Sequence, residues 1–354
     1  MRYFTIGPVQ MSARIVQAGG HQARYFRDSA FAGEVISAQN KLLSVLDAEA
    51  GSKIAIMSGS GTAGMEASVT NFSERGDTVL VVNGGSFGQR FVDIAEFFQR
   101  RVINHRVPHG RNIDLDNLRT QIAEDQPTVL LLNVHETSTG QLYDVAAIGK
   151  MCREFGVLLV CDVVSAVASD PLSMADMGID VALFSSNKGL GLAPGAAFLI
   201  AGPLALSRLN CTESYYLALE PYFDGSERGQ PPVTSSVGVL QQLFERLNEI
   251  DEFGGFEAVV QKTKRNAESF RGGISDLGIE VFPQTPSNAL TAFILPHGSS
   301  NELYAFLKNE HGLIINKSAW GLEADVPRIA HVGDLSIEDH TTLVGAIKEY
   351  LQCT

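Results

Sequence analysis

The stretch that decides the fold covers residues 157–190 and reads VLLVCDVVSAVASDPLSMADMGIDVALFSSNKGL. It holds two short apolar runs, Val157–Asp162 and Val181–Ser185, and polar residues follow each of them. Runs of this kind are typical of strands buried on both faces of a parallel sheet. Asp162 closes the first run, and Lys188 follows the second within small and polar residues. We therefore expect this carboxylate and this amine at neighbouring strand ends.

The same pattern extends along most of the chain. Further strands are predicted at Lys53–Met57, Thr78–Val82, Arg101–Val107, Thr128–Val134 and Ala196–Ala201. Helical patterns cover Ala32–Leu46, Thr62–Phe72, Phe91–Phe98, Asp114–Ile122 and Val145–Phe155. Apolar strands that alternate with amphipathic helices predict a three-layer α/β architecture around a mostly parallel sheet.

The character of the sequence changes near Gly254-Gly255. A long helical pattern, from Ser236 to about Leu247, leads up to this point. Beyond it we expect helices at Phe256–Leu277, Ser300–Glu310 and Ser336–Tyr350, with strand-like segments at Glu280–Phe282, Leu290–Leu295, Leu313–Asn316 and Arg328–His331. The 354 residues suffice for two domains. We predict an N-terminal arm over 1–18, a large domain over 19–250 and a smaller α+β domain over 251–354.

Net charge and cysteine spacing exclude several classes of binding partner. The formal charge of −13 argues against nucleic acid and anionic membrane, although a local basic pocket could still bind a small anion. The four cysteines, Cys152, Cys161, Cys211 and Cys353, have no metal-ligand spacing, and we expect no metal. Cys152 and Cys161 lie in apolar surroundings and are predicted to be reduced core residues, which favours a cytoplasmic location. The chain shows no signal-peptide pattern and no apolar run typical of a membrane span.

A glycine-rich loop, SGSGTAG at residues 58–64, lies between a predicted strand and a predicted helix. Glycines allow close backbone approach to a phosphate, and the helix start supplies free N–H groups. A plain helix-capping turn is the structural alternative. A dinucleotide fingerprint is the functional alternative, but the next strand ends in Asn83, where that motif needs an acidic residue.

Two further loops follow predicted strands. In NGGSFGQR, residues 83–90, Phe87 is surrounded by small and polar residues and could stack on a planar ring or tuck into the core. In HETSTG, residues 135–140, a polar cluster closes a buried strand and needs hydrogen-bond partners. Structural capping explains the second loop as well as a ligand does.

Together with Lys188 and Asp162, these loops indicate a binding site for one ligand. Burial lowers the pKa of a lysine, which suits Schiff-base formation with an aldehyde. A carboxylate nearby can keep a pyridine nitrogen protonated and make the ring an electron sink. A structural ion pair is the alternative for the pair alone. A phosphate cradle, a stacking aromatic, an acid and a lysine together predict pyridoxal 5'-phosphate (PLP).

With these motifs the sequence resembles class V PLP-dependent aminotransferases, in particular the branch with alanine–glyoxylate, serine–glyoxylate and 2-aminoethylphosphonate–pyruvate enzymes. The resemblance covers nearly the whole chain and implies PLP-dependent transferase fold type I. It implies that Lys188 carries the Schiff base and that Asp162 contacts the pyridine nitrogen. The other implied cofactor contacts are Ser60, Gly61 and Thr62 at the phosphate, Phe87 on the ring, Thr137 at the phenolic oxygen and Asn187 beside the phosphate. The implied substrate contacts are Arg328 for the α-carboxylate, Gly7 in the arm, and Arg27.

The segment RGQPPVT, residues 228–234, departs from the family pattern. In the family, a Thr-Pro-like segment of the partner subunit reaches the phosphate, which implies a homodimer. Pro231 stands here where a threonine is expected, so Gln230 and Thr234 become the candidates. Arg24 and Arg27 could equally form surface or interface salt bridges.

These features predict a ping-pong transamination between a small amino donor and a small 2-keto acid such as pyruvate or glyoxylate. Lys188 would remove the Cα proton of the donor. A PLP lyase on the same fold is the main alternative. A class V desulfurase needs a cysteine in a mobile C-terminal loop, and Cys353 at the chain end is the only cysteine there. Decarboxylation stays open, and a nicotinamide oxidoreductase would explain only the glycine-rich loop.

Overall fold

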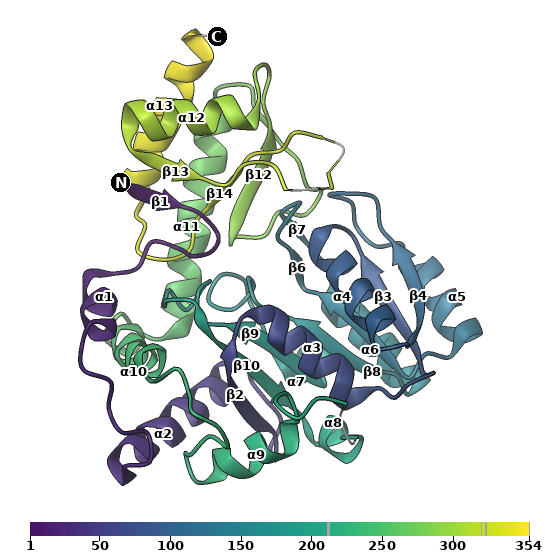
Figure 1. Cartoon of the computed structure of the whole chain (residues 1–354). Coiled ribbons are helices and arrows are strands. Elements are labelled where there is room, and N and C mark those ends of the chain that lie inside the picture. The colour runs from purple at the N-terminus through teal and green to yellow at the C-terminus, as the bar shows by residue number, and fades with distance from the viewer. Residues whose placement is uncertain (211–212, 320, 323, 354) are drawn as a thin grey trace.

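The computed structural model describes residues 1–210, 213–319, 321–322 and 324–353 (Figure 1). At its centre lies a seven-stranded sheet. In spatial order its strands are β2 (Lys53–Gly59), β10 (Gly195–Ala201), β9 (Val181–Ser185), β8 (Leu158–Asp162), β5 (Val129–Asn133), β3 (Thr78–Asn83) and β4 (Arg101–Arg106). Every neighbouring pair is parallel except the two pairs made by β10. The mostly parallel sheet expected from the sequence is confirmed.

Alternate residues of the same strands enter two different hydrophobic cores. Leu80, Leu130 and Leu159 face one core, whereas Val81, Leu131 and Val160 face the other. Side chains alternate across a strand, so a sheet covered on both faces needs apolar residues at every position. The first core is covered by α2 (Ser29–Val45), α5 (Leu115–Asp125), α6 (Val145–Phe155) and α10 (Val237–Glu252), and the second by α3 (Gly61–Phe72), α4 (Ser86–Phe97), α8 (Pro203–Ser207) and α9 (Leu219–Glu227).

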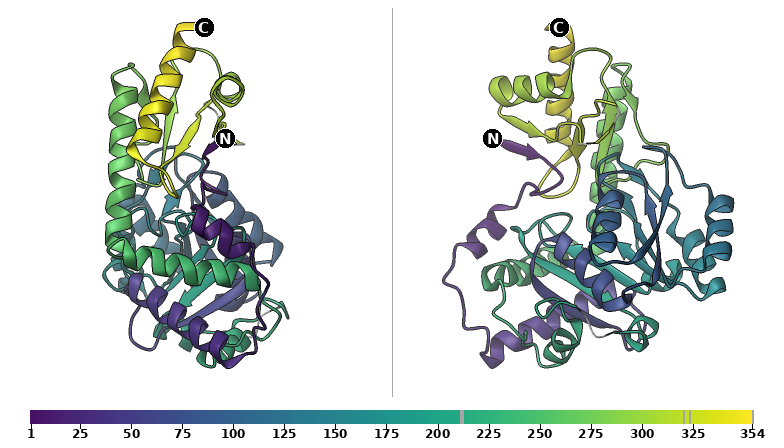
Figure 2. Two further views of the ribbon diagram at one scale, coloured as in Figure 1. Left: turned by 90° about the vertical axis from the view of Figure 1, so that its left-hand side faces the viewer. Right: turned by 45° about the vertical axis from the view of Figure 1, so that its right-hand side comes forward.

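A smaller unit with its own cores stands on the large one (Figure 2). Its three-stranded antiparallel sheet has the order β11 (Glu280–Val281), β12 (Leu290–Ile294), β14 (Arg328–Ala330). The helices are α11 (Phe256–Ser275), α12 (Ser300–His311) and α13 (Ile337–Cys353). The N-terminal strand β1 (Arg2–Phe4) pairs in parallel with β13 (Leu313–Ile315). The start of the chain is therefore joined to its C-terminal part.

Several elements differ from the sequence-based expectation. Helix α2 begins at Ser29, earlier than expected, because the Asp28 carboxylate accepts hydrogen bonds from the first turn. Helix α10 continues to Glu252, so the boundary predicted at residue 250 falls inside its last turn. The sequence reading gave no position for α1 (Ala13–Gly19), α7 (Met174–Met177), α8, α9 or the hairpin of β6 (His135–Glu136) and β7 (Gln141–Leu142). The domain division itself stays a prediction.

The cysteines behave largely as expected. Cys152 and Cys161 are buried free thiols, as predicted, and Cys353 is an exposed one. Cys211 lies outside the described residues. None of the helices in the described ranges combines the length and hydrophobicity that crossing a membrane requires.

Candidate active site

Asp162 lies at the carboxyl end of β8, beside Asn133 at the end of β5. Its carboxylate is 7% exposed and accepts hydrogen bonds from Asn133 Nδ2 at 2.9 Å and from the backbone N–H of Val164 at 2.8 Å. Burial raises the pKa of Asp162 to about 7. Within the described chain no basic group forms an ion pair with this carboxylate. Asp162 is therefore a buried acid without a directly bound cation.

Lys188 follows β9, two strands from β5 in the sheet. Burial lowers its pKa to about 8, although the negative charge of Asp162 acts in the opposite direction. Among the described residues its Nζ has neither a hydrogen bond nor an ion pair. The N-terminal arm passes close to this side chain, because a Cβ atom on Gly7 would lie 2.7 Å from Lys188 Cε. Close to neutral pH, a part of this lysine is an uncharged amine.

The glycine-rich loop forms the start of α3, as the sequence suggested. Ser60 is the N-cap of this helix, and its side chain makes no capping hydrogen bond within the described chain. Gly61 packs closely, since a Cβ there would lie 3.1 Å from Val164 Cγ2 and 3.6 Å from Ser185 Cβ. The free N–H groups of a helix start bind anions. The loop thus places an anion-binding helix end next to the strand ends that carry Asp162 and Lys188.

Phe87 was expected in a loop, but it is the second residue of α4. The helix starts early because the carboxylate of Glu136 accepts hydrogen bonds from the N–H groups of Phe87, at 3.4 Å, and Gly88, at 3.0 Å. Glu136 is 1% exposed. A Cβ on Gly85 would lie 2.7 Å from Glu136 Cδ, so glycine is needed there. A buried acid from another segment therefore fixes the backbone that carries Phe87.

Arg90 connects Phe87 with the glycine-rich loop. The central carbon of its guanidinium lies 5.0 Å from the centroid of the Phe87 ring. One of its N–H groups donates to Thr62 Oγ1 at 3.2 Å. The candidate ring-stacking residue and a candidate phosphate contact are thus held by one exposed cation. Beyond β9, Ser185 Oγ donates to Asn187 Oδ1 at 3.0 Å.

Thr137 belongs to a buried polar chain. Its hydroxyl lies 3.0 Å from Ser165 Oγ, which lies 2.8 Å from His135 Nδ1. Burial lowers the pKa of His135 to about 3, so the ring is neutral. Arg328 reaches the same region, because its Nη1 donates to the Thr137 carbonyl at 3.0 Å while Nη2 donates to the Lys317 carbonyl at 3.0 Å. Burial lowers the pKa of Arg328 to about 10, which leaves it charged at neutral pH.

The structure does not join every predicted site residue to this group. Gln230 and Arg27 hydrogen-bond to each other, with Gln230 Nε2 donating to the Arg27 carbonyl at 3.3 Å. Thr234 is exposed. In the described parts of the chain, no hydrogen bond links these three residues to Lys188 or Asp162. Arg27 and Thr234 are exposed and Gln230 is partly buried.

A family model matches most of this chain: the aminotransferase class-V model covers residues 13–327. The chain belongs to the class-V aminotransferase family. It is 27% identical over 322 residues to a 2-aminoethylphosphonate–pyruvate transaminase of Vibrio vulnificus, a match that covers 88% of this chain and 87% of the relative. The enzyme class and the family expected from the sequence are thereby confirmed.

Solved structures agree over almost the full length. An alanine–glyoxylate aminotransferase from Nostoc sp. superimposes with a TM-score of 0.93 at 28% identity, over 99% of this chain and 96% of that one. An aspartate aminotransferase from Thermus thermophilus gives 0.92 at 26% identity, over 99% of both chains. The fold is that of PLP-dependent transferases of fold type I, as predicted, and this family and fold are those of PLP enzymes.

The residues around Lys188 fit this cofactor. The buried side-chain atoms without a hydrogen-bond partner in the described chain include Ser58 Oγ, Asn133 Oδ1 and His135 Nε2. Unpaired buried polar atoms are costly unless a ligand or water satisfies them. None of the described basic side chains forms an ion pair with Asp162, and a protonated ring nitrogen would supply a cation there. The described residues hold no group of three or more His, Cys, Asp or Glu that could bind a metal ion.

The structure adds residues that sequence reasoning did not select. Asn133 and Ser165 bind Asp162 and Thr137, respectively, and Arg90 joins Phe87 to Thr62. Glu136 stood inside the polar motif HETSTG, but nothing in the local sequence connects it with the start of a distant helix. The only signal for Glu136 was that a charged residue follows three positions after the buried strand that ends at Asn133, where a carboxylate needs a buried partner.

Proposed function

We propose that this protein is a PLP-dependent aminotransferase that uses a small amino donor and a small 2-keto acid. The named relatives support this assignment, since one acts on 2-aminoethylphosphonate and pyruvate and another on alanine and glyoxylate. The donor would be of the alanine, serine or 2-aminoethylphosphonate type, and the acceptor would be pyruvate or glyoxylate.

The observation that carries the proposal is the pair Lys188 and Asp162. The lysine has a lowered pKa and no partner for Nζ in the described residues, so its amine is available for covalent attachment of an aldehyde. The buried carboxylate of Asp162 lies at the neighbouring strand end, and no basic side chain of the described residues pairs with it. An amine and an acid with these properties match the aldehyde and the pyridine nitrogen of PLP.

We assign the remaining cofactor contacts from where each side chain lies relative to Lys188 and Asp162. Ser60, Gly61 and Thr62 would hold the phosphate at the start of α3, with Asn187 beside them. The Phe87 ring would cover one face of the cofactor. Thr137, oriented by Ser165, would donate to the phenolic oxygen.

PLP, when bound, withdraws the negative charge that develops at the substrate Cα. Lys188 would take the proton from that Cα and return it during the second half of the reaction. Asp162 would keep the proton on the pyridine nitrogen. Arg328 would bind the α-carboxylate through its planar guanidinium and thereby orient the Cα–H bond toward Lys188. Gly7 would leave the space that the lysine needs.

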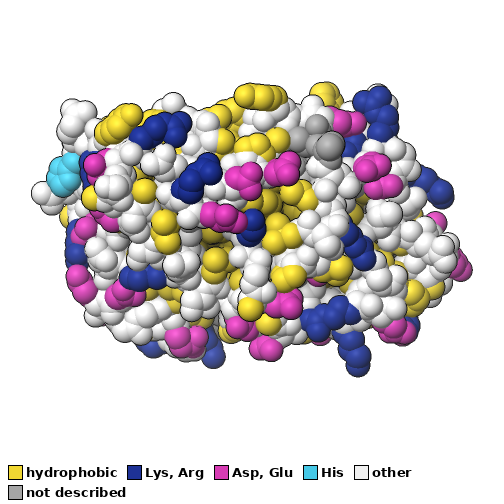
Figure 3. Space-filling view, turned by 90° about the horizontal axis from the view of Figure 1, so that it is seen from below, with side chains coloured by type: hydrophobic (Ala, Val, Ile, Leu, Met, Phe, Trp, Pro, Cys, Tyr) yellow, Lys and Arg dark blue, Asp and Glu magenta, His cyan; other side chains and the backbone are white. Residues whose placement is uncertain are grey.

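A homodimer is part of the proposal. Gln230 and Thr234 would reach the phosphate of the partner subunit, and Arg27 would approach its substrate. Large aromatic residues are open on the single chain, with Tyr25 70% and Tyr215 96% exposed. On the face seen in Figure 3, hydrophobic side chains also lie open between charges of both signs. The free buried thiols support a cytoplasmic location.

The test is amino transfer by the purified protein. L-alanine, L-serine, L-aspartate and 2-aminoethylphosphonate are each incubated with pyruvate or glyoxylate, and both products are quantified by chromatography. We expect one donor to yield its carbonyl product and the aminated acceptor in equal amounts. Release of CO2 or of another fragment from the donor, without formation of an aminated acceptor, would contradict transamination and favour a lyase.

A further inference from the structure

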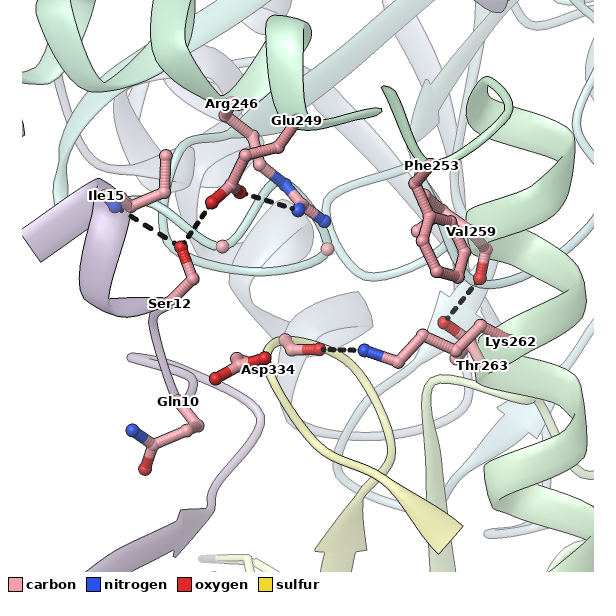
Figure 4. A pocket seen from close by; sticks show the side chains of 13 residues that line it. Gln10, Ser12, Ile15, Arg246, Glu249, Phe253, Val259, Lys262, Thr263 and Asp334 are labelled. Carbon is pink, nitrogen blue, oxygen red and sulfur yellow. Dashed lines mark hydrogen bonds and ion pairs between the residues drawn. The ribbon is translucent and has the colours of Figure 1, made fainter. Parts of the chain in front are cut away.

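A cavity of about 240 Å³ lies between the N-terminal arm, helices α10 and α11, and the loop after β14 (Figure 4). Its polar wall is formed by Ser12, Arg246, Glu249, Lys262 and Thr263. Neither the proposed reaction nor the proposed cofactor contacts use these five side chains. The cavity therefore differs from the proposed cofactor site, although Gly189 and Gly191 of the loop after Lys188 also line it.

The cavity is rich in hydrogen-bond donors that lack partners. Arg246 donates from Nε to the Leu190 carbonyl at 3.0 Å and from Nη1 to Glu249 Oε2 at 3.1 Å. Lys262 donates a single long hydrogen bond, 3.4 Å, to the Gly333 carbonyl. A guanidinium carries five N–H groups and an ammonium three. Most of these eight donors have no acceptor within the described residues.

The carboxylates nearby take up only part of this donor capacity. Glu249 Oε1 accepts from the Ser12 hydroxyl at 2.7 Å, and its second oxygen accepts from Arg246. The Thr263 hydroxyl donates to a backbone carbonyl of its own helix at 3.1 Å. Asp334 has a half-exposed side chain 4.0 Å from Arg2, whose shorter ion pair, 2.6 Å, is with Asp339. The described hydrogen bonds thus leave more unused donors than unused acceptors in the cavity.

Figure 4 shows the head groups of Arg246 and Lys262 directed into the same space from two helices. Val259 and Phe253 supply apolar wall on one side of this space, and Phe253 is 51% exposed. Two cations next to an apolar surface suit a carboxylate with a short hydrocarbon body better than an inorganic anion. We propose that this cavity binds a small monocarboxylate, with its carboxylate between Arg246 and Lys262 and its hydrocarbon part against Phe253 and Val259.

A carboxylate bound there would join three segments of the candidate active site. Arg246 holds the Leu190 carbonyl, and the Gly191 N–H donates to the Lys188 carbonyl at 2.8 Å. The Asp334 N–H donates to the Gln10 carbonyl at 2.8 Å, which ties the loop after β14 to the arm. The ligand would therefore hold the Lys188 loop, the arm with Gly7 and the strand with Arg328 in one arrangement.

Protection of Lys262 from chemical acetylation tests the proposal directly. The protein with bound cofactor is treated with acetic anhydride in sodium propionate and in sodium chloride of equal ionic strength, and acetylation is mapped by peptide mass spectrometry. We expect propionate to slow acetylation of Lys262 and to leave Lys264 unchanged. Lys264 is the matched control, because it lies on the same helix and carries an exposed ion pair with Glu268. Equal reactivity of Lys262 in both salts would overturn the proposal.

Thermal unfolding separates this site from the active site. Arg328→Gln removes the proposed substrate carboxylate contact, and the stabilisation by propionate is measured in that background. Adding Lys262→Gln should weaken the apparent affinity about tenfold, the loss expected for one charged hydrogen bond, whereas adding Lys264→Gln should not. Stabilisation that persists with Lys262→Gln, or that inorganic phosphate produces and propionate does not, would contradict a carboxylate site at Lys262.

Discussion

Two buried polar clusters in this molecule differ in how completely they are hydrogen-bonded. Around Asp162, the atoms Asn133 Oδ1 and His135 Nε2 have no partner in the described chain. In the smaller unit, His331 Nε2 lies 2.8 Å from Thr291 Oγ1, and His331 Nδ1 lies 2.9 Å from His340 Nε2. His340 Nδ1 in turn lies 2.7 Å from the Ser336 carbonyl.

The side chains of Asp162, Asn133, His135, Thr291, His331 and His340 are all buried, so burial alone does not distinguish the two clusters. A saturated network stabilises one conformation of the chain. An unsaturated network keeps polar atoms ready for a group that the chain does not itself provide. Between these two clusters, incomplete hydrogen bonding, more than burial, distinguishes the candidate active site.

The largest expected effect is the loss of turnover when Lys188 of the candidate active site is replaced. Lys188→Ala should lower turnover by about 10²–10⁴-fold, the range for loss of a positioned acid–base group, or more if attachment is also needed. Initial rates of product formation measure this. Lys188→Arg keeps the charge but not the nucleophilic amine and should be as impaired. Near-normal turnover by either variant would contradict the assignment of Lys188.

The next effect concerns the acid. Asp162→Asn keeps the side-chain shape but removes the negative charge, and turnover should fall by about 10²–10³-fold, as for loss of one preorganised electrostatic group. Retention of the cofactor, followed by absorbance after gel filtration, shows that the fold is intact. Asp180→Asn is the matched control, since Asp180 is a partly buried acid that accepts the Leu159 N–H away from Lys188. Equal rates for both variants would argue against the role of Asp162.

A smaller effect is expected at Glu136, which accepts hydrogen bonds from the backbone that carries Phe87 and is not among the proposed cofactor contacts. Glu136→Gln places an amide NH2 against backbone N–H donors and should weaken PLP binding about tenfold, the loss of one charged hydrogen bond. Equilibrium dialysis of PLP with the cofactor-free protein measures the change. Glu124→Gln, at an exposed position of α5, is the control. Unchanged affinity would show that α4 holds Phe87 without this carboxylate.

The smallest effect belongs to the saturated cluster and depends on pH. Burial lowers the pKa of both His331 and His340, so the unfolded chain binds protons below about pH 6.5 that the folded chain does not. Stability should therefore be level above pH 6.5 and fall below it, by up to about 1.4 kcal/mol per pH unit for each histidine. Urea unfolding at pH 7.5 and 5.5 measures the decrease. His340→Gln should reduce it, and an identical decrease in both proteins would contradict the neutral pair.

Features that depend on local sequence could be predicted, whereas contacts between distant segments could not. The central sheet was predictable because its strands are apolar on both faces, and Asp162 and Lys188 stood out at their ends. The start of α4 was not, because Gly85 has no side chain to cap it and the acid that does so, Glu136, comes from a distant segment. The contact between Arg27 and Gln230 was equally hidden, since only tertiary packing brings those segments together.

The cavity near Lys262 illustrates the same limit. Arg246 and Lys262 lie on the consecutive helices α10 and α11, whereas Ser12 comes from the N-terminal arm, and each is an ordinary residue of its own helix or cap. Periodicity shows which face of a helix is apolar, but not which charged groups from different helices meet. The excess of N–H donors on Arg246 and Lys262 becomes visible only when the hydrogen-bond partners of both side chains are known.

The most direct test of the central claim is to locate the covalent link between the cofactor and the chain. The protein is saturated with PLP and reduced with sodium borohydride, and its peptides are mapped by mass spectrometry. We expect the reduced cofactor to be attached to Lys188 and the other lysines to be unmodified. Attachment at a different lysine such as Lys317, or no attachment after saturation, would contradict it.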